Sequence, residues 1–219
     1  VSASGLREFT LDAGRGSVAV RFDDVSTVGL VSTDSLSGWS MQRVGSTLKV
    51  QSPQVSFDWW PGLWFGDDTL VTVVLPRSLE RNLDANLHLG AGSLDVRGDF
   101  RSLSAAVGAG SFTVEGSMPS LTVDLAAGSA DVNARDVSTA DLTVSAGRMN
   151  ATLGGAAPDQ ARLDVSAGSM AVAFPAGTYD LAKDVSAGSL ENELSLSQDS
   201  RHRVSATVSA GSLKLIAAH

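Results

Sequence analysis

The stretch from Leu121 to Val132 reads LTVDLAAGSADV, and its Ala-Gly step returns along most of the chain. Seven glycines between Leu89 and Leu213 are each preceded by alanine; six of them are followed by serine and one by Arg148. They lie 18 to 23 residues apart, at Gly92, Gly110, Gly128, Gly147, Gly168, Gly188 and Gly211. A short and nearly fixed period of this kind indicates a repeat architecture.

Apolar residues stand at fixed offsets from each glycine: seven, five and three before it, and two and four after it. Around Gly128 they are Leu121, Val123, Leu125, Ala130 and Val132. Across the seven repeats only Lys183 and Asn192 break this rule, and the residues between these positions are mostly polar or small. Alternation with a period of two predicts strands that bury one face. We expect Lys183 to escape burial, either by local bulging of the strand or by reaching solvent with its ammonium group.

The side of the alternation changes at each glycine, so the chain must turn a corner there. Glycine permits the backbone conformation that such a corner needs. Two short strands joined by a tight bend, repeated every 18 to 23 residues, predict an all-β solenoid, a single-stranded parallel β-helix. A sandwich of hairpins also gives short alternating strands. It is the less favoured alternative, because only stacked coils have a reason to repeat one corner at one offset.

The whole chain, residues 1–219, is predicted to form a single elongated domain. Regular coils are expected over 79–219, and residues 1–78 form an irregular β part that opens with one coil around Gly16. Three further strands are expected in that part, at Val28 to Val31, Thr47 to Val50 and Thr69 to Leu75. The Ser/Gly-rich stretch around Trp39 and Met41, between the first two, is predicted to be a loop or irregular coil.

Composition narrows the range of functions. The net charge of −8 and pI near 4.7 argue against nucleic acid or anionic lipid as partners. The chain has no cysteine, which excludes disulfides, thiol nucleophiles and thiolate metal sites. No apolar run approaches the roughly 20 residues that span a bilayer. Because the chain begins at Val1 without methionine or a leader, we expect that a signal or membrane anchor could precede it.

One segment, residues 56–68, departs from the repeat and is rich in large apolar side chains around a Pro-Gly turn. Bulky rings fit poorly into a narrow solenoid interior. The segment is therefore either a lid that closes the rod, or an exposed loop that docks a protein, a glycan or a membrane interface. Its candidate partner-binding residues are Phe57, Trp59, Trp60, Leu63, Trp64 and Phe65.

The last coil of the sequence is a candidate for self-association. It finishes on Leu213, Leu215 and Ile216, and only three residues follow. Open strand edges invite pairing with another chain. We therefore expect end-to-end association into a homo-oligomer through these residues.

No catalytic, cofactor or metal site is predicted, and the protein is not expected to be an enzyme. Two acidic rows share offsets, and on adjacent coils about 4.8 Å apart their carboxylates could approach one another; they are Asp124, Asp164 and Asp184, and Asp95, Asp131 and Glu191. Other residue types occupy the same offsets elsewhere, which favours a solvated face. The histidines, His88, His202 and His219, are isolated in the sequence.

The Leu75-Pro76 step, the GAGSLDV stretch at 90–96 and the repeated SAGSL coils resemble the bacterial "putative adhesin" domain family of unknown function. The resemblance is strongest from Leu75 onward. It implies a right-handed β-solenoid of the kind often attached to membrane segments or found in envelope-associated proteins. It brings no catalytic residues to this chain, and the aromatic segment lies outside the pattern.

These observations lead to a first hypothesis about function. The protein is expected to be a non-catalytic interaction module of the cell envelope or surface, which binds protein or glycan partners through the rod surface or the aromatic loop. Contact with a membrane would come only through that loop or an anchor outside this chain. The alternatives are a structural or polymerising scaffold, for which a cytoplasmic location is also open, and a polysaccharide-active enzyme.

Overall fold

The computed structural model describes residues 1–33, 36–53 and 70–217, and strands dominate it. Nine of them occupy the first part of the chain: β1 (Glu8–Asp23), β2 (Gly29–Ser32), β3 (Ser40–Val44), β4 (Thr47–Gln51), β5 (Leu70–Pro76), β6 (Asp84–Arg97), β7 (Ser102–Ser117), β8 (Ser120–Arg135) and β9 (Thr139–Gly154). A 3-10 turn, Arg77–Leu79, follows β5. The remaining strands are β10 (Gln160–Val165), β11 (Ser169–Phe174), β12 (Thr178–Val185), β13 (Ser189–Asn192), β14 (Ser195–Leu196), β15 (Arg203–Val208) and β16 (Ser212–Ala217).

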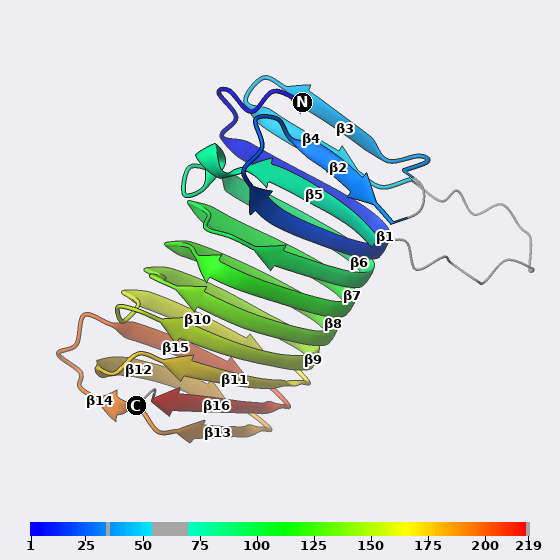
Figure 1. The fold of residues 1–219 in the computed structure, drawn as a ribbon. Helices are drawn as coiled ribbons and strands as arrows, with labels where there is room; N and C mark the ends of the chain where they lie inside the picture. Colours follow the sequence, from blue (N-terminus) through cyan, green and yellow to red (C-terminus); the bar gives the residue numbers. More distant parts are fainter. Residues whose placement is uncertain (34–35, 54–69, 218–219) are drawn as a thin grey trace, which may run out of the picture.

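Each coil has two arms joined at a corner glycine. Strands β1 and β6 to β9 contain both arms, whereas the later coils divide into the pairs β10 and β11, β12 and β13, and β15 and β16. The first arms form one layer and the second arms another, and the two layers meet along the edge where the corners lie (Figure 1). The apolar positions of both arms are buried between the layers. The predicted all-β solenoid is confirmed.

The corner glycines stack in one file along this edge. The strand register pairs Gly16 with Gly92, and it continues through Gly110 and Gly128 to Gly147. Beyond Gly147 the file runs to Gly168, Gly211 and Gly188, each against the backbone of the glycine before it. The solenoid was predicted because one corner returned at one offset, and that corner does occupy one place in every coil of this file.

The first strand of the chain does not form the end of the rod. On one side β1 pairs with β6, and on the other its two arms pair with β4 and β5, all in parallel. Beyond these lie β3 and β2, which run antiparallel to β4 and β5. The strands expected near 28–31, 47–50 and 69–75 are confirmed. The expectation of an irregular stretch around Met41 is wrong, because residues 40–44 pair along β4.

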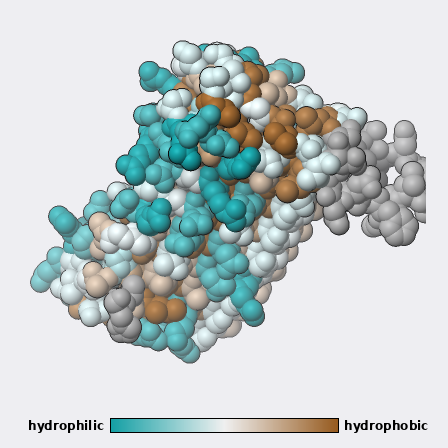
Figure 2. Space-filling model, in the orientation of Figure 1, coloured by the Kyte–Doolittle hydropathy of each residue, from teal (hydrophilic) through white to brown (hydrophobic). Residues whose placement is uncertain are grey.

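The N-terminal end of the rod carries exposed apolar side chains. Figure 2 shows the second-arm layer, where hydrophobic side chains gather over β2 and β5. Val31 on β2 and Leu70 on β5 are both exposed, as is Val44 on β3. A paler band follows the edge of the corners, as expected from its glycine, alanine and serine residues (Figure 2).

The last two coils are exchanged relative to their order in the sequence. Strand β15 pairs with β10 on one side and β12 on the other, and β16 pairs with β11 and β13. The coil of β12 and β13 therefore lies outermost. It carries Lys183 and Asn192, the two polar residues at inward positions, and both are exposed there. Because an inner coil would bury an ammonium group without a partner, this order is the stable one. The expected exposure of Lys183 is confirmed.

This exchange corrects the prediction about end-to-end association. Leu213 and Leu215 are buried, and Ile216 lies on a strand paired on both sides. Leu213 and Leu215 pair with β11 on one side and β13 on the other, and Ile216 pairs with Ala173 of β11, so this coil does not end the rod. Sequence order misled the prediction, since the coil that comes last in the chain is covered by the coil before it.

Lys183 should also limit association at this end of the rod. An inward-pointing charge on an edge strand discourages another chain from pairing there. We expect Lys183→Leu to increase self-association. The leucine would give β12 an apolar side chain at every inward position, next to the edge of β12 that no described strand covers at residue 183. Sedimentation velocity over a wide range of protein concentrations measures the effect. Lys49→Leu, the same change on the outer face of β4, is the control, and equal behaviour of the two variants would contradict this role.

Candidate functional site

Outward-facing polar side chains line up across neighbouring first arms near the N-terminal end. Because every second residue of a strand faces solvent, β1 presents Glu8, Thr10 and Asp12 there. The register places Asp84, Asn86 and His88 of β6 directly beside them. Together with Thr47 and Gln51 of β4 and Ser102 and Ser104 of β7, these residues form what we call the first-arm polar face.

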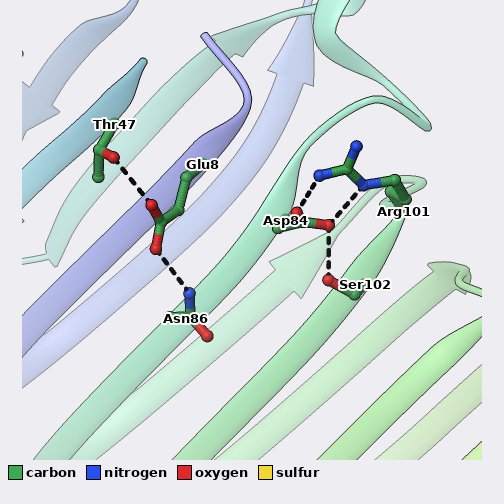
Figure 3. Close-up of polar contacts among 6 residues, drawn as sticks. All are labelled: Glu8, Thr47, Asp84, Asn86, Arg101 and Ser102. Atoms are coloured by element: carbon green, nitrogen blue, oxygen red, sulfur yellow. Dashed lines mark hydrogen bonds and ion pairs between the residues drawn. The ribbon is translucent and has the colours of Figure 1, made fainter. Parts of the chain in front are cut away.

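Glu8 is held by neutral donors on both sides (Figure 3). The Thr47 hydroxyl donates to its Oε2 at 2.8 Å, and the Asn86 amide donates to its Oε1 at 3.2 Å. Among the described residues, no cationic side chain pairs with this carboxylate. The side chains thus fix the position of Glu8 while its negative charge stays available to a ligand.

Asp84, one strand further along, has a different environment (Figure 3). The Arg101 guanidinium contacts both carboxylate oxygens, with a Nε–Oδ1 distance of 2.7 Å, and the Ser102 hydroxyl donates to Oδ1 at 2.7 Å. The hydrogen bond from Arg101 lowers the pKa of Asp84, although partial desolvation opposes this. Asp84 is therefore ionised at neutral pH, with its charge compensated by Arg101.

A shallow depression of about 310 Å³ lies between these rows and the corner edge. Thr10, Asp12, Asn86, His88 and Ser104 line it, above the backbone of two buried leucines. Within it, His88 Nδ1 lies 3.2 Å from Asp12 Oδ1, and both side chains are about half exposed. The depression therefore presents hydroxyl, amide, carboxylate and imidazole groups side by side to a ligand.

The pairing of His88 with Asp12 was missed in the sequence, where His88 was described as isolated. The two residues are 76 positions apart, yet both stand four residues before a corner glycine. Applying the shared offset to the opening coil would have found the pair. No hydroxyl in the described part of the chain hydrogen-bonds to this imidazole, so what the structure presents is a hydrogen-bonding surface.

The acidic rows do not bring carboxylates onto adjacent strands, which agrees with the solvated face that the mixed offsets favoured. Thr143 separates Asp124 from Asp164, and Thr207 separates Asp164 from Asp184. In the second row, Thr113 lies between Asp95 and Asp131, while Glu191 pairs with Lys214. Across residues 1–33, 36–53 and 70–217, no three metal-ligating side chains gather in a group suited to a metal ion.

The aromatic candidate residues Phe57, Trp59, Trp60, Leu63, Trp64 and Phe65 lie outside the described residues. The described strands on either side are in register with β1: Gln51, the last residue of β4, pairs with Asp12, and Leu70, the first residue of β5, pairs with Ser17.

Comparison with known proteins leaves the family open. No protein-family model matches the chain, and no curated protein matches it. One solved structure that resembles it, a putative cell adhesion protein from Clostridium sporogenes, is 9% identical with a TM-score of 0.43, over 100% of this chain and 96% of that chain. Another, a putative adhesin from Bacteroides fragilis, is 8% identical with a TM-score of 0.37, over 99% and 94%. Both are too distant for a functional conclusion, which therefore depends on the side chains of this chain.

Proposed function

We propose that this protein is a non-catalytic interaction module that binds a glycan through the first-arm polar face. The observation that supports this most directly is the registered set of hydrogen-bonding groups on β1 and β6. Asp12, Asn86 and His88 surround a shallow depression with planar polar side chains that can pair with neighbouring sugar hydroxyls. The backbone that carries these side chains is held in place, because β1 and β6 are each paired with parallel strands on both sides.

The aromatic segment adds to this proposal. Tryptophan rings combine a large apolar face with a polar edge, and they are common where a ligand stacks on a protein. In the sequence, the segment that carries Trp59, Trp60 and Trp64 follows β4, whose last residue Gln51 lies beside Asp12.

Envelope or extracellular location is part of the same proposal, as is membership of the adhesin-like family that the repeats resemble. In the part of the chain that the structure describes, none of the helices has the length and apolar character of a membrane span. A polymerising scaffold is the second candidate. The observation that favours it is the pair of edge strands, β3 and β13, which have unpaired sides at the two ends of the rod.

The proposal predicts which substitutions abolish binding. A neutral-oligosaccharide array should identify a ligand for the wild-type protein. Replacing both Asn86 and His88 with alanine should then weaken its binding at least about tenfold, since losing two hydrogen bonds worth about 1 kcal/mol each exceeds the about 1.4 kcal/mol that corresponds to that factor. Isothermal titration calorimetry measures the change.

Two controls separate the polar face from general damage. Asn133→Ala removes the same side chain from an exposed position on β8 in the other layer, and it should leave binding unchanged. Replacing Trp59, Trp60 and Trp64 with alanine tests the aromatic contribution separately. The proposal would be overturned if the Asn86 and His88 variant bound the ligand as tightly as wild type, or if no glycan bound while filaments formed.

A further inference from the structure

A second depression, on the opposite layer, is lined on one side by an arginine that forms no hydrogen bond or ion pair with the described residues. It lies near the C-terminal end of the second-arm layer and has a volume of about 280 Å³. Arg148 of β9 forms one wall and Lys214 of β16 the other, with Ser169, Ala171 and Ser212 between them. None of these residues belongs to the first-arm polar face.

Arg148 breaks a regular row. The position after each corner glycine forms a file of serines across the second arms, in which Ser93 donates to Ser17 at 2.9 Å. Arg148 stands in that file between Ser129 and Ser169. An arginine serves the corner no better than serine does, so its presence calls for another explanation.

The side chain of Arg148 is exposed, and no hydrogen bond or ion pair to it occurs within the described residues. Other arginines, such as Arg15 and Arg162, also form no ion pair within the described residues, but Arg148 is the arginine that lines this depression. Its planar guanidinium offers two parallel N–H donors, the geometry that binds a carboxylate.

The shape of the depression follows from side-chain size. Ala171 lies between Asn150 and Lys214 in its row, and Ser169 lies between Arg148 and Ser212 in the next. Short side chains on β11 thus leave a hollow between longer ones on β9 and β16. Since neighbouring strands are about 4.8 Å apart, β9 and β16 are about 10 Å apart, which is wide enough for a sugar ring.

The charges on the second wall limit the kind of anion that fits. Lys214 Nζ lies 3.0 Å from Glu193 and 3.6 Å from Glu191, and these contacts raise the pKa of Lys214. That ammonium is therefore already compensated, and Glu191 stands on the rim. A polyanion would be repelled by these carboxylates and by the negative charge of the whole chain. A ligand with a single carboxylate on an otherwise neutral molecule could place that carboxylate at Arg148 and avoid most of this repulsion.

We propose that this depression binds a carboxylate-bearing sugar within a mostly neutral saccharide. Arg148 pairs with the carboxylate, the hydroxyls of Ser169 and Ser212 bond to ring hydroxyls, and the ring lies over Ala171. The site is independent of the first-arm polar face, and it would remain if that proposal failed. An acidic peptide is the competing ligand, and it lacks the ring hydroxyls that the serines would meet.

Sialyllactose and its methyl ester form a matched pair of probes, since they differ only at the carboxylate. Isothermal titration calorimetry should show saturable binding of sialyllactose to the wild-type protein and at least tenfold weaker binding of the methyl ester. Arg148→Ser restores the residue found in the other coils, so it should fold normally and weaken sialyllactose binding at least tenfold. The affinity of Arg148→Lys for sialyllactose should lie between those of the wild-type protein and Arg148→Ser, because lysine keeps the positive charge but lacks the two parallel N–H donors.

Arg162→Ser is the control, because it removes the same charge from an exposed position on β10 in the other layer and should leave binding unchanged. The proposal would be overturned by equal binding to Arg148→Ser and wild type, or by equal losses in the two arginine variants. Failure of sialyllactose to bind would also overturn it, as would tighter binding of a peptide with a single glutamate. None of these results depends on Asn86 or His88.

Discussion

Replacing Val165 with aspartate should abolish cooperative folding. Val165 is 1% exposed and lies on β10, which is paired on one side with β9 and on the other with β15. The substitution removes apolar burial worth about 1.5–3 kcal/mol and buries a carboxylate with no partner, at a further cost of several kcal/mol. Because domains are stable by only about 5–15 kcal/mol, circular dichroism should show a lost or strongly lowered thermal transition.

Val185→Asp is a matched control for this experiment. Val185 stands at the same offset from its glycine, but it lies in the outermost coil and is 37% exposed. The same aspartate can reach water there, so we expect only a small change in melting temperature. Equal destabilisation by the two variants would contradict the assignment of β12 and β13 to the end of the rod.

Gly110→Ala should be the second most damaging change, at a cost of about 2–4 kcal/mol. Gly110 has a φ of 128°, which side-chain-bearing residues rarely adopt. A Cβ there would also lie 2.8 Å from the carbonyl carbon of Gly92, and the stacked backbone cannot yield without separating two coils. Urea denaturation measures the loss of unfolding free energy.

Gly16→Ala separates the backbone strain from the clash between stacked coils as causes of this loss. Its φ of 124° is similar, yet a Cβ at Gly16 would meet no atom of the described residues within 4 Å. Gly16 thus has the unusual backbone conformation without a described glycine stacked against its Cβ position. We therefore expect Gly16→Ala to show only the backbone strain, about 1–3 kcal/mol. A loss at Gly16 as large as that at Gly110 would mean that stacking of the file contributes nothing.

The coils could be predicted because the corner imposes a strict count. Once Gly92 and Gly110 are aligned, the offset alone pairs Leu87 with Ala105, and the structure has this register. The order of the coils could not be read in the same way. Every coil offers the same apolar pattern to its neighbours, so β15 fits beside β10 as well as beside β12. The polar residues Lys183 and Asn192 at inward positions were the sequence signal that their coil lies outermost.

The polar face was hidden for a related reason. Glu8 meets Asn86 only because the chain leaves β1, builds β2 to β5 on one side, and returns to place β6 on the other. In the sequence, 78 positions separate the two residues. The structural neighbours of an outward-facing residue depend on coil order, and this order is what the repeat pattern leaves undetermined.

The exchanged order of the last coils has a mechanical consequence. A stack of coils is expected to peel from its outermost member, and here that member on one side is a segment tethered at both of its own ends, to β11 and to β15. A tethered segment that detaches stays close to its docking place and can return quickly. Fraying on this side should therefore begin at β12 and β13 and be readily reversed, while β16 stays paired with β11.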